Sequence, residues 1–153
     1  MINQQVHTYN VNITSNLHNK ENYSFKFACK YLEVYKQGTN ENNDFYLLNS
    51  NKELQKKGVY LFLSENKRII YIGCCYSDEK NRNIIDRVKQ HFRDGDTGSI
   101  RRKLNSEQKL ILENSSLYYL ILENDIREIL FTEALLIGSI RPEFNFIYSQ
   151  VNI

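Results

Sequence analysis

Residues 58–75 read GVYLFLSENKRIIYIGCC, two apolar and aromatic runs with a short polar stretch between them. Each run has the length and composition of a β-strand, and both are rich in β-branched and aromatic residues. Asn66 and Lys67 suit the tight turn that would join them. The segment therefore predicts a β-hairpin, and the rest of the fold is built around it.

The loop length of this hairpin decides which side chains share a face. With a two-residue loop at Asn66 and Lys67, position 62 pairs with position 71 and position 60 with position 73. Tyr60 and Tyr71 then lie diagonally on one face of the hairpin. A three-residue loop would break that register, so the loop is part of the prediction.

Three later segments complete the expected domain. Ile84 to Arg93 is predicted as a helix, because Ile84, Ile85, Val88 and Phe92 recur at helical spacing. A third strand is expected from Ser116 to Leu122. A last helix, capped by Asn124 or Asp125, runs to about Ile140 and stops before Pro142. We expect an α+β fold, a small three-stranded antiparallel sheet flanked by helices.

The chain of 153 residues has room for one compact core. We divide it into an N-terminal extension, residues 1–56, and a domain of residues 57–153. Within the extension, a short strand is expected around Val6 to Ile13. A helix is expected from Tyr23 to Gln37, with Gly38 as its C-cap, because Phe25, Ala28, Leu32 and Tyr35 recur at helical spacing.

Composition narrows the class of protein. Apolar residues make up 41% and charged residues 25%, which favours an ordinary globular protein. No apolar stretch approaches the roughly 20 residues that cross a bilayer, and the first 25 residues are too polar for a signal peptide. We expect a soluble, cytoplasmic protein without membrane contact. Cys29, Cys74 and Cys75 lack the paired spacing of zinc sites, so free thiols are expected. Cys74 and Cys75 continue a strand pattern and are expected to serve packing.

Positive charge gathers in one part of the chain. The net charge is only +2, yet residues 80–103 hold eight basic side chains against three acids. Ser99 is expected to cap a short basic helix that ends at Leu104. Arg101, Arg102 and Lys103 on that helix are predicted to contact nucleic-acid phosphates, with a merely solvated face as the alternative.

Glu133 stands out on the predicted last helix. The helix has an apolar stripe with Glu133 in its middle, formed by Ile126, Ile129, Leu130, Ile137 and Ile140. A buried carboxylate costs several kcal/mol unless it is paired, protonated or bound to a metal. The stripe therefore indicates a metal site, unless its edge lies one position away or Glu133 pairs with an arginine.

These residues together resemble the GIY-YIG nuclease family. The paired signature corresponds to Gly58-Val59-Tyr60 and Tyr71-Ile72-Gly73, with Val59 in place of isoleucine. Further along, the family pattern matches an arginine on the next helix, a glutamate on a later helix and an asparagine after a proline: Arg87, Glu133 and Asn145. The resemblance covers about 90 of the 153 residues.

The choice of arginine is the open point of this pattern. The loop Cys74 to Asn83 is longer than is usual in the family, which leaves Arg82 as a rival to Arg87. His91 follows Arg87 by four residues, a pairing similar to that of the restriction-enzyme branch, and favours Arg87.

The resemblance implies a role for each residue. Glu133 would hold one divalent ion, Mg²⁺ or Mn²⁺, because a hard cation that keeps its waters suits a single carboxylate. Tyr60, poised by a cation or by His91, would be the general base, and Tyr71 would bind the phosphate or the attacking water. Arg87 would grip the phosphate oxygens, and Asn145 would orient Glu133 or its surroundings.

The expected function is that of a metal-dependent DNA endonuclease. RNA is a less favoured substrate, and a homodimer is possible. The alternative is a catalytically weak module that keeps the nuclease fold and binds nucleic acid or protein. The presence of all five motif parts argues against it, because binding alone needs no tyrosine base and metal carboxylate together.

Overall fold

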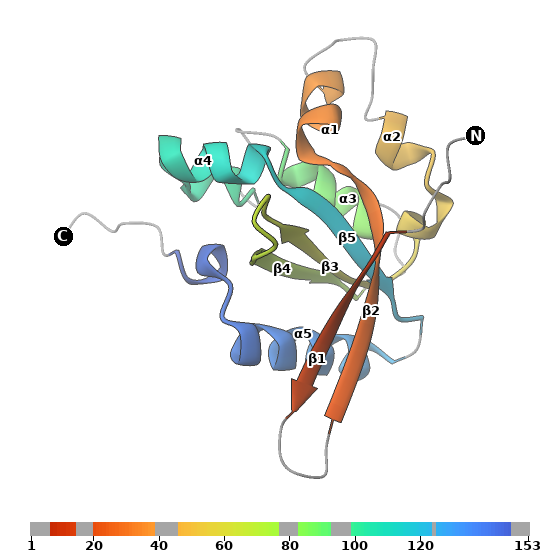
Figure 1. Cartoon of the computed structure of the whole chain (residues 1–153). Coiled ribbons are helices and arrows are strands. Elements are labelled where there is room, and N and C mark those ends of the chain that lie inside the picture. Colours follow the sequence, from red (N-terminus) through yellow and green to blue (C-terminus); the bar gives the residue numbers. More distant parts are fainter. Residues whose placement is uncertain are drawn as a thin grey trace, which may run out of the picture.

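The computed structural model describes residues 7–14, 20–38, 46–76, 83–92, 99–123 and 125–147 (Figure 1). The strands are β1 (Thr8–Thr14), β2 (Lys20–Lys30), β3 (Gly58–Leu63), β4 (Ile69–Cys75) and β5 (Ser116–Ile121). The α-helices are α1 (Tyr31–Gly38), α2 (Tyr46–Asn49), α3 (Ile84–Gln90), α4 (Ser106–Glu113) and α5 (Ile126–Ile140). Three 3-10 turns are η1 (Lys52–Gln55), η2 (Arg101–Lys103) and η3 (Glu143–Phe146).

The sheet has five strands in the order β1-β2-β5-β3-β4, and every neighbouring pair is antiparallel. The predicted three strands are present as β3, β4 and β5, but the predicted strand number is wrong because the N-terminal hairpin β1-β2 joins the same sheet beside β5. β3 has a neighbour on each side and all six of its residues are buried, whereas β4 forms one edge.

The N-terminal region corrects the sequence prediction in part. The strand expected near Val6 to Ile13 is confirmed as β1. The helix expected from Tyr23 to Gln37 is wrong in its first half, because residues 20–30 form β2 and the helix begins at Tyr31. In β2, apolar residues also recur with the period of two that marks a strand, with Phe25 and Cys29 buried and Lys26 and Lys30 exposed. That period dominates here.

The β3-β4 hairpin has the predicted strand pairing, although its loop differs from the predicted one. Phe62 pairs with Tyr71 and Tyr60 with Gly73, as expected. The loop, however, has three residues, 65–67, closed by a hydrogen bond from the Ser64 N–H to the Arg68 carbonyl oxygen (2.7 Å). A bulge next to the loop shifts the register by one residue and restores the pairing beyond it.

The later elements agree with most of the sequence pattern. β5 and α5 lie where they were expected, and Asp125 caps α5 by accepting from the Arg127 N–H. The expected cap at Ser99 is wrong: the basic segment is a 3-10 turn that follows Ile100 and has no side-chain cap. α4 was not predicted, although Asn105 and Gln108 form a capping box at its start. Arg93 and residues 94–98 lie outside the described residues.

Two hydrophobic cores lie on opposite faces of the sheet. On one face, α3 packs through Ile84 and Val88 against Tyr60 and Phe62. On the other face, α5 packs against the sheet through Ile129 and Leu136, and the strand β1 lies across the helix (Figure 1). Tyr60 and Glu133 therefore start on different faces of the same sheet. None of the helices in the described parts of the chain has both the length and the apolar character that crossing a membrane requires.

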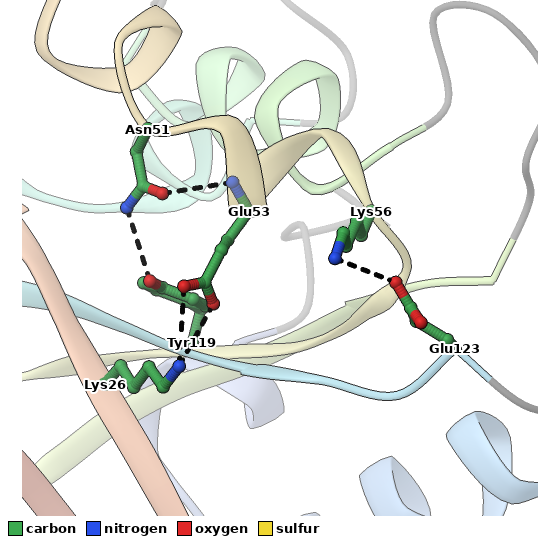
Figure 2. Close-up of polar contacts among 6 residues, drawn as sticks. All are labelled: Lys26, Asn51, Glu53, Lys56, Tyr119 and Glu123. Carbon is green, nitrogen blue, oxygen red and sulfur yellow. Dashed lines mark hydrogen bonds and ion pairs between the residues drawn. The ribbon is translucent and has the colours of Figure 1, made fainter.

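Polar contacts fasten the segment before β3 to the sheet (Figure 2). The Asn51 side chain accepts from the Glu53 N–H (3.2 Å) and donates to the Tyr119 hydroxyl (3.4 Å). Glu53 pairs with Lys26 of β2 at 3.2 Å, and Lys56 pairs with Glu123 at 3.0 Å. These exposed ion pairs stabilise little individually, but they tie residues 51–56 to β2 and β5. The boundary at residue 56 stays a prediction.

The start of β3 requires a glycine. A Cβ on Gly58 would lie 2.0 Å from the Leu120 carbonyl oxygen of the neighbouring strand, and backbone cannot move away as a side chain can. We expect Gly58→Ala to lower the free energy of unfolding by about 2 kcal/mol or more. The matched control is Gly138→Ala on α5, where a Cβ would meet nothing within 4 Å. That change should stabilise by roughly 0.5–1 kcal/mol. Equal urea midpoints for the two variants would contradict this packing.

Candidate active site

The two signature tyrosines lie on the α3 side of the β3-β4 hairpin. Tyr60 is fully buried and stands opposite Gly73 of the edge strand. A Cβ on Gly73 would lie 2.4 Å from the Tyr60 hydroxyl oxygen. Only a glycine therefore allows the Tyr60 ring to cross β4 and bring its hydroxyl to the sheet edge. The ring of Tyr71 lies beside it, with centroids 6.4 Å apart.

His91 holds the hydroxyl of Tyr60 from behind. The imidazole is fully buried at the C-cap of α3, and its Nε2 lies 2.7 Å from the Tyr60 oxygen. Its Nδ1 accepts a hydrogen bond from the Ile100 N–H (3.0 Å). Since Nδ1 is an acceptor, the proton of the neutral ring is on Nε2, and His91 donates to Tyr60.

Burial keeps His91 neutral. Desolvation, with the charges of Arg87 and Lys103, lowers the pKa of His91 from its usual 6.5 to about 3. At neutral pH the ring is thus a fixed donor and is not an acceptor for the tyrosine proton. An N–H donor at this distance would stabilise negative charge on the Tyr60 oxygen.

The hydrogen-bond chain continues outward to Tyr71. Tyr60 and Tyr71 share a side-chain hydrogen bond, which lowers the pKa of Tyr71. The Tyr60 oxygen already accepts from His91, so its own proton points to Tyr71. Tyr71 is only partly buried and forms the outer end of the chain. Burial nevertheless raises the pKa of Tyr71 to about 12 and that of Tyr60 well above 10.0, and the charge of Arg87 opposes both increases.

Arg87 lies on α3, one turn before His91. Its Nη1 donates to the Gln90 side chain at 2.9 Å. The same guanidinium lowers the pKa of Tyr60, of Tyr71 and of His91, so its charge acts on the whole chain of hydrogen bonds. The rival Arg82 lies outside the described residues.

Glu133 reaches the same edge from the opposite face. The predicted apolar stripe is wrong at Ile126 and Leu130, which are exposed, while Ile129 and Leu136 are buried. The buried face of α5 is therefore rotated from the predicted one, and the half-buried Glu133 stands at its border. Its charge raises the pKa of Tyr60 and of Tyr71. The predicted residues thus meet around β4, with Glu133 coming from one face and the tyrosines from the other.

Cys74 was missed as a member of the site. It follows Gly73 on β4, and its thiol shares a hydrogen bond with the Glu133 side chain. Burial first, and then Glu133, raises the pKa of Cys74 well above its usual 9.0. The sequence held a signal for this contact, because alternation along β4 places Cys74 on the face opposite Tyr71.

Asn145 closes the edge of β4. Its Oδ1 accepts from the Ile72 N–H and its Nδ2 donates to the Ile72 carbonyl oxygen, both at 2.8 Å. The side chain thus imitates a strand partner between Tyr71 and Gly73. That Asn145 orients Glu133 itself stays a prediction.

The basic turn η2 divides into buried and exposed parts. Arg101 is buried, and its guanidinium pairs with Glu113 at 2.9 Å, so it does not offer its charge at the surface as expected. Arg102 and Lys103 are exposed. The effect of Lys103 on the pKa of His91 brings its charge near the site.

The acidic groups available to a metal are few. Among the described residues, no three His, Cys, Asp or Glu side chains form a group that could enclose an ion. Glu133 offers one half-exposed carboxylate, with the Cys74 thiol beside it. This donor set fits a divalent ion that keeps most of its water ligands, as Mg²⁺ does.

Comparisons with known proteins match the part of the chain that holds these residues. Residues 56–146 match the family model described as the UvrC-like GIY-YIG domain. UvrABC system protein C of Lawsonia intracellularis is 34% identical over 90 residues, and that of Methanosphaera stadtmanae is 32% identical over 92 residues. The matches cover 59% and 60% of this chain but only 13% of each relative. No solved structure matches the chain.

The passage of Tyr60 over Gly73 can be tested by a double-mutant cycle. Gly73→Ala should destabilise the wild-type fold by about 1–3 kcal/mol, because the new Cβ displaces the Tyr60 ring from His91. In a Tyr60→Leu background, which lacks the displaced atoms, the same change should cost clearly less. Urea unfolding of the four proteins measures the difference. An equal cost in both backgrounds would show that Tyr60 does not lie over Gly73.

Proposed function

Because the chain belongs to the UvrC-like GIY-YIG domain family, we propose that it is an endonuclease that hydrolyses DNA phosphodiester bonds with one divalent ion. Family membership supports the enzyme class. The observation that carries the proposal further is the convergence of Tyr60, His91 and Glu133 on one strand edge. Hydrolysis needs an activated water, stabilisation of charge on the phosphate and help for the leaving 3′ oxygen, and this edge offers groups for each.

The tyrosine pair supplies the base in this proposal. Tyr71, at the exposed end of the chain, would lose its proton to solvent once a bound cation lowers its pKa, and its phenolate oxygen would then accept the proton of the attacking water. Tyr60 lies behind it, and its oxygen is fixed by the His91 Nε2–H at 2.7 Å. Because this hydrogen bond favours negative charge on Tyr60, Tyr60 is also favoured as the base when the two tyrosines share one negative charge. The raised pKa values require a cation close by at the moment of reaction.

Arg87 is the permanent cation of the site. Its guanidinium already lowers the pKa of both tyrosines, and its planar set of donors suits two oxygens of one phosphate. We propose that it binds the non-bridging oxygens of the cleaved phosphate. The charge that grips the substrate would thereby also favour loss of the tyrosine proton.

Glu133 is the proposed ligand of the divalent ion, Mg²⁺ or Mn²⁺. When bound, such an ion neutralises charge on the phosphate and on the leaving oxygen. Cys74 donates to the same carboxylate from β4 and so orients Glu133 against the sheet. Asn145 contributes indirectly, because it fixes the backbone between Tyr71 and Gly73.

The proposed function is that of the domain alone, because the matches span only 13% of the length of each relative. DNA is the proposed substrate ahead of RNA, and cytoplasmic location and a homodimer stay predictions.

Cleavage of supercoiled plasmid and branched DNA tests the function directly. We expect Mg²⁺-dependent nicking by the wild type that EDTA abolishes, and a loss of at least about 100-fold for Glu133→Gln. Glu128→Gln is the matched control, because Glu128 is an exposed carboxylate on the same helix. DNA binding without cleavage by the wild type, unchanged in Glu133→Gln, would overturn the proposal in favour of a catalytically weak binding module.

A further inference from the structure

A hollow of about 430 Å³ lies where β1 crosses the end of α5. We call it the β1 hollow. It is lined by residues 9–12 of β1, and by Arg68, Arg141 and Glu143 among others. The family match begins at residue 56, so one wall of the hollow comes from the family domain and the other from the preceding hairpin.

The charge of the hollow favours an anion. Arg68 has an exposed side chain and meets Glu143 only at 3.9 Å, a contact that screens its charge weakly. The Arg141 guanidinium lies over the Phe146 ring, 5.2 Å from its centroid. The charged residues that line the hollow are thus two arginines and one glutamate.

The backbone at Arg141 is also unusual. Arg141 has φ 55° and ψ 62°, the left-handed conformation in which helices commonly end, and its N–H donates to the Ile137 carbonyl oxygen at 2.8 Å. Glycine adopts this conformation without the steric cost that any other side chain incurs. An arginine here therefore suggests a use for its side chain that offsets the strain.

The hollow and the proposed active site share two elements, α5 and β4. Ile140 at the border of the hollow lies seven residues after Glu133 on α5, which is roughly 10 Å along the helix axis. Ile69, also at its border, lies two residues before Tyr71 on β4, or about 7 Å along the strand. A DNA strand held at the proposed site would therefore pass the hollow within one or two nucleotides.

We propose that the β1 hollow binds a backbone phosphate of the substrate DNA, one or two nucleotides from the cleaved bond. Arg68 and Arg141 hold the phosphate, and β1 lies against the adjoining sugar or base. The inference rests on the proposed function and gives the N-terminal hairpin a part in substrate binding. Phosphate contacts of this kind place the strand and carry little sequence information.

Binding without cleavage tests the proposal. Fluorescence anisotropy of a labelled DNA duplex is measured in EDTA at several salt concentrations for the double variant Arg68→Gln/Arg141→Gln. We expect affinity to fall about tenfold at low salt, and the slope of log affinity against log salt to decrease by about one. The control is Arg127→Gln, because Arg127 is an exposed arginine at the other end of α5 and pairs with Asp125; it should bind like the wild type.

A second variant separates binding from the turn. Arg141→Gly relieves the left-handed backbone, so its melting temperature should equal or exceed that of the wild type, while its DNA affinity falls. If Arg141 served the turn alone, glycine would leave DNA affinity unchanged, and the proposal would be overturned. Circular dichroism of each variant checks that the fold is kept.

The outcomes distinguish this inference from the proposed function. If the wild type cleaves DNA while the double variant matches Arg127→Gln in affinity and salt slope, the hollow is not a subsite and the nuclease function stands. If the wild type binds DNA without cleaving it, and the double variant binds DNA more weakly than the wild type, the subsite stands and the nuclease function fails. A wild type that neither binds nor cleaves DNA overturns both.

Discussion

The hydrogen bond between His91 Nε2 and the Tyr60 hydroxyl oxygen, 2.7 Å long and fully buried, is the contact on which the site depends. A buried hydroxyl or imidazole without a partner costs about 1–3 kcal/mol, so each group requires the other. The bond also joins the centre of the sheet to the end of α3. The Ile100 N–H determines its direction, because it occupies Nδ1 and leaves the proton on Nε2. Gly73 then allows the Tyr60 ring to reach the edge.

The edge position of β4 explains why one site can draw on both faces of the sheet. Tyr71 leaves the strand towards α3, Cys74 leaves it towards α5, and Glu133 meets Cys74 there. An edge strand exposes backbone groups that invite pairing with another chain. Asn145 covers them at Ile72, which protects the edge at the point where the tyrosines need a fixed backbone. The carboxylate and the phenols therefore approach the same strand from its two faces.

Much of this arrangement could be predicted from local pattern. The register of Tyr60 and Tyr71 follows from strand alternation and was confirmed, although the three-residue loop kept it only through a bulge. Residues 20–30 have both a helical and a strand spacing of apolar groups, and pairing with β5 decides between them. The tautomer of His91 and the pairing of Arg101 with Glu113 depend on residues that fold beside them, which spacing along the chain does not reveal.

The protonation state of His91 is the most direct test of the proposed site, because the proposed role of the tyrosine pair requires a neutral imidazole that donates to Tyr60. Nitrogen NMR of the ¹⁵N-labelled imidazole reports which ring nitrogen carries the proton and how it titrates. We expect protonation on Nε2 alone, with no titration between pH 5 and 8, since the pKa of His91 is lowered to about 3. A proton on Nδ1, or a titration near the usual 6.5, would contradict this proposal.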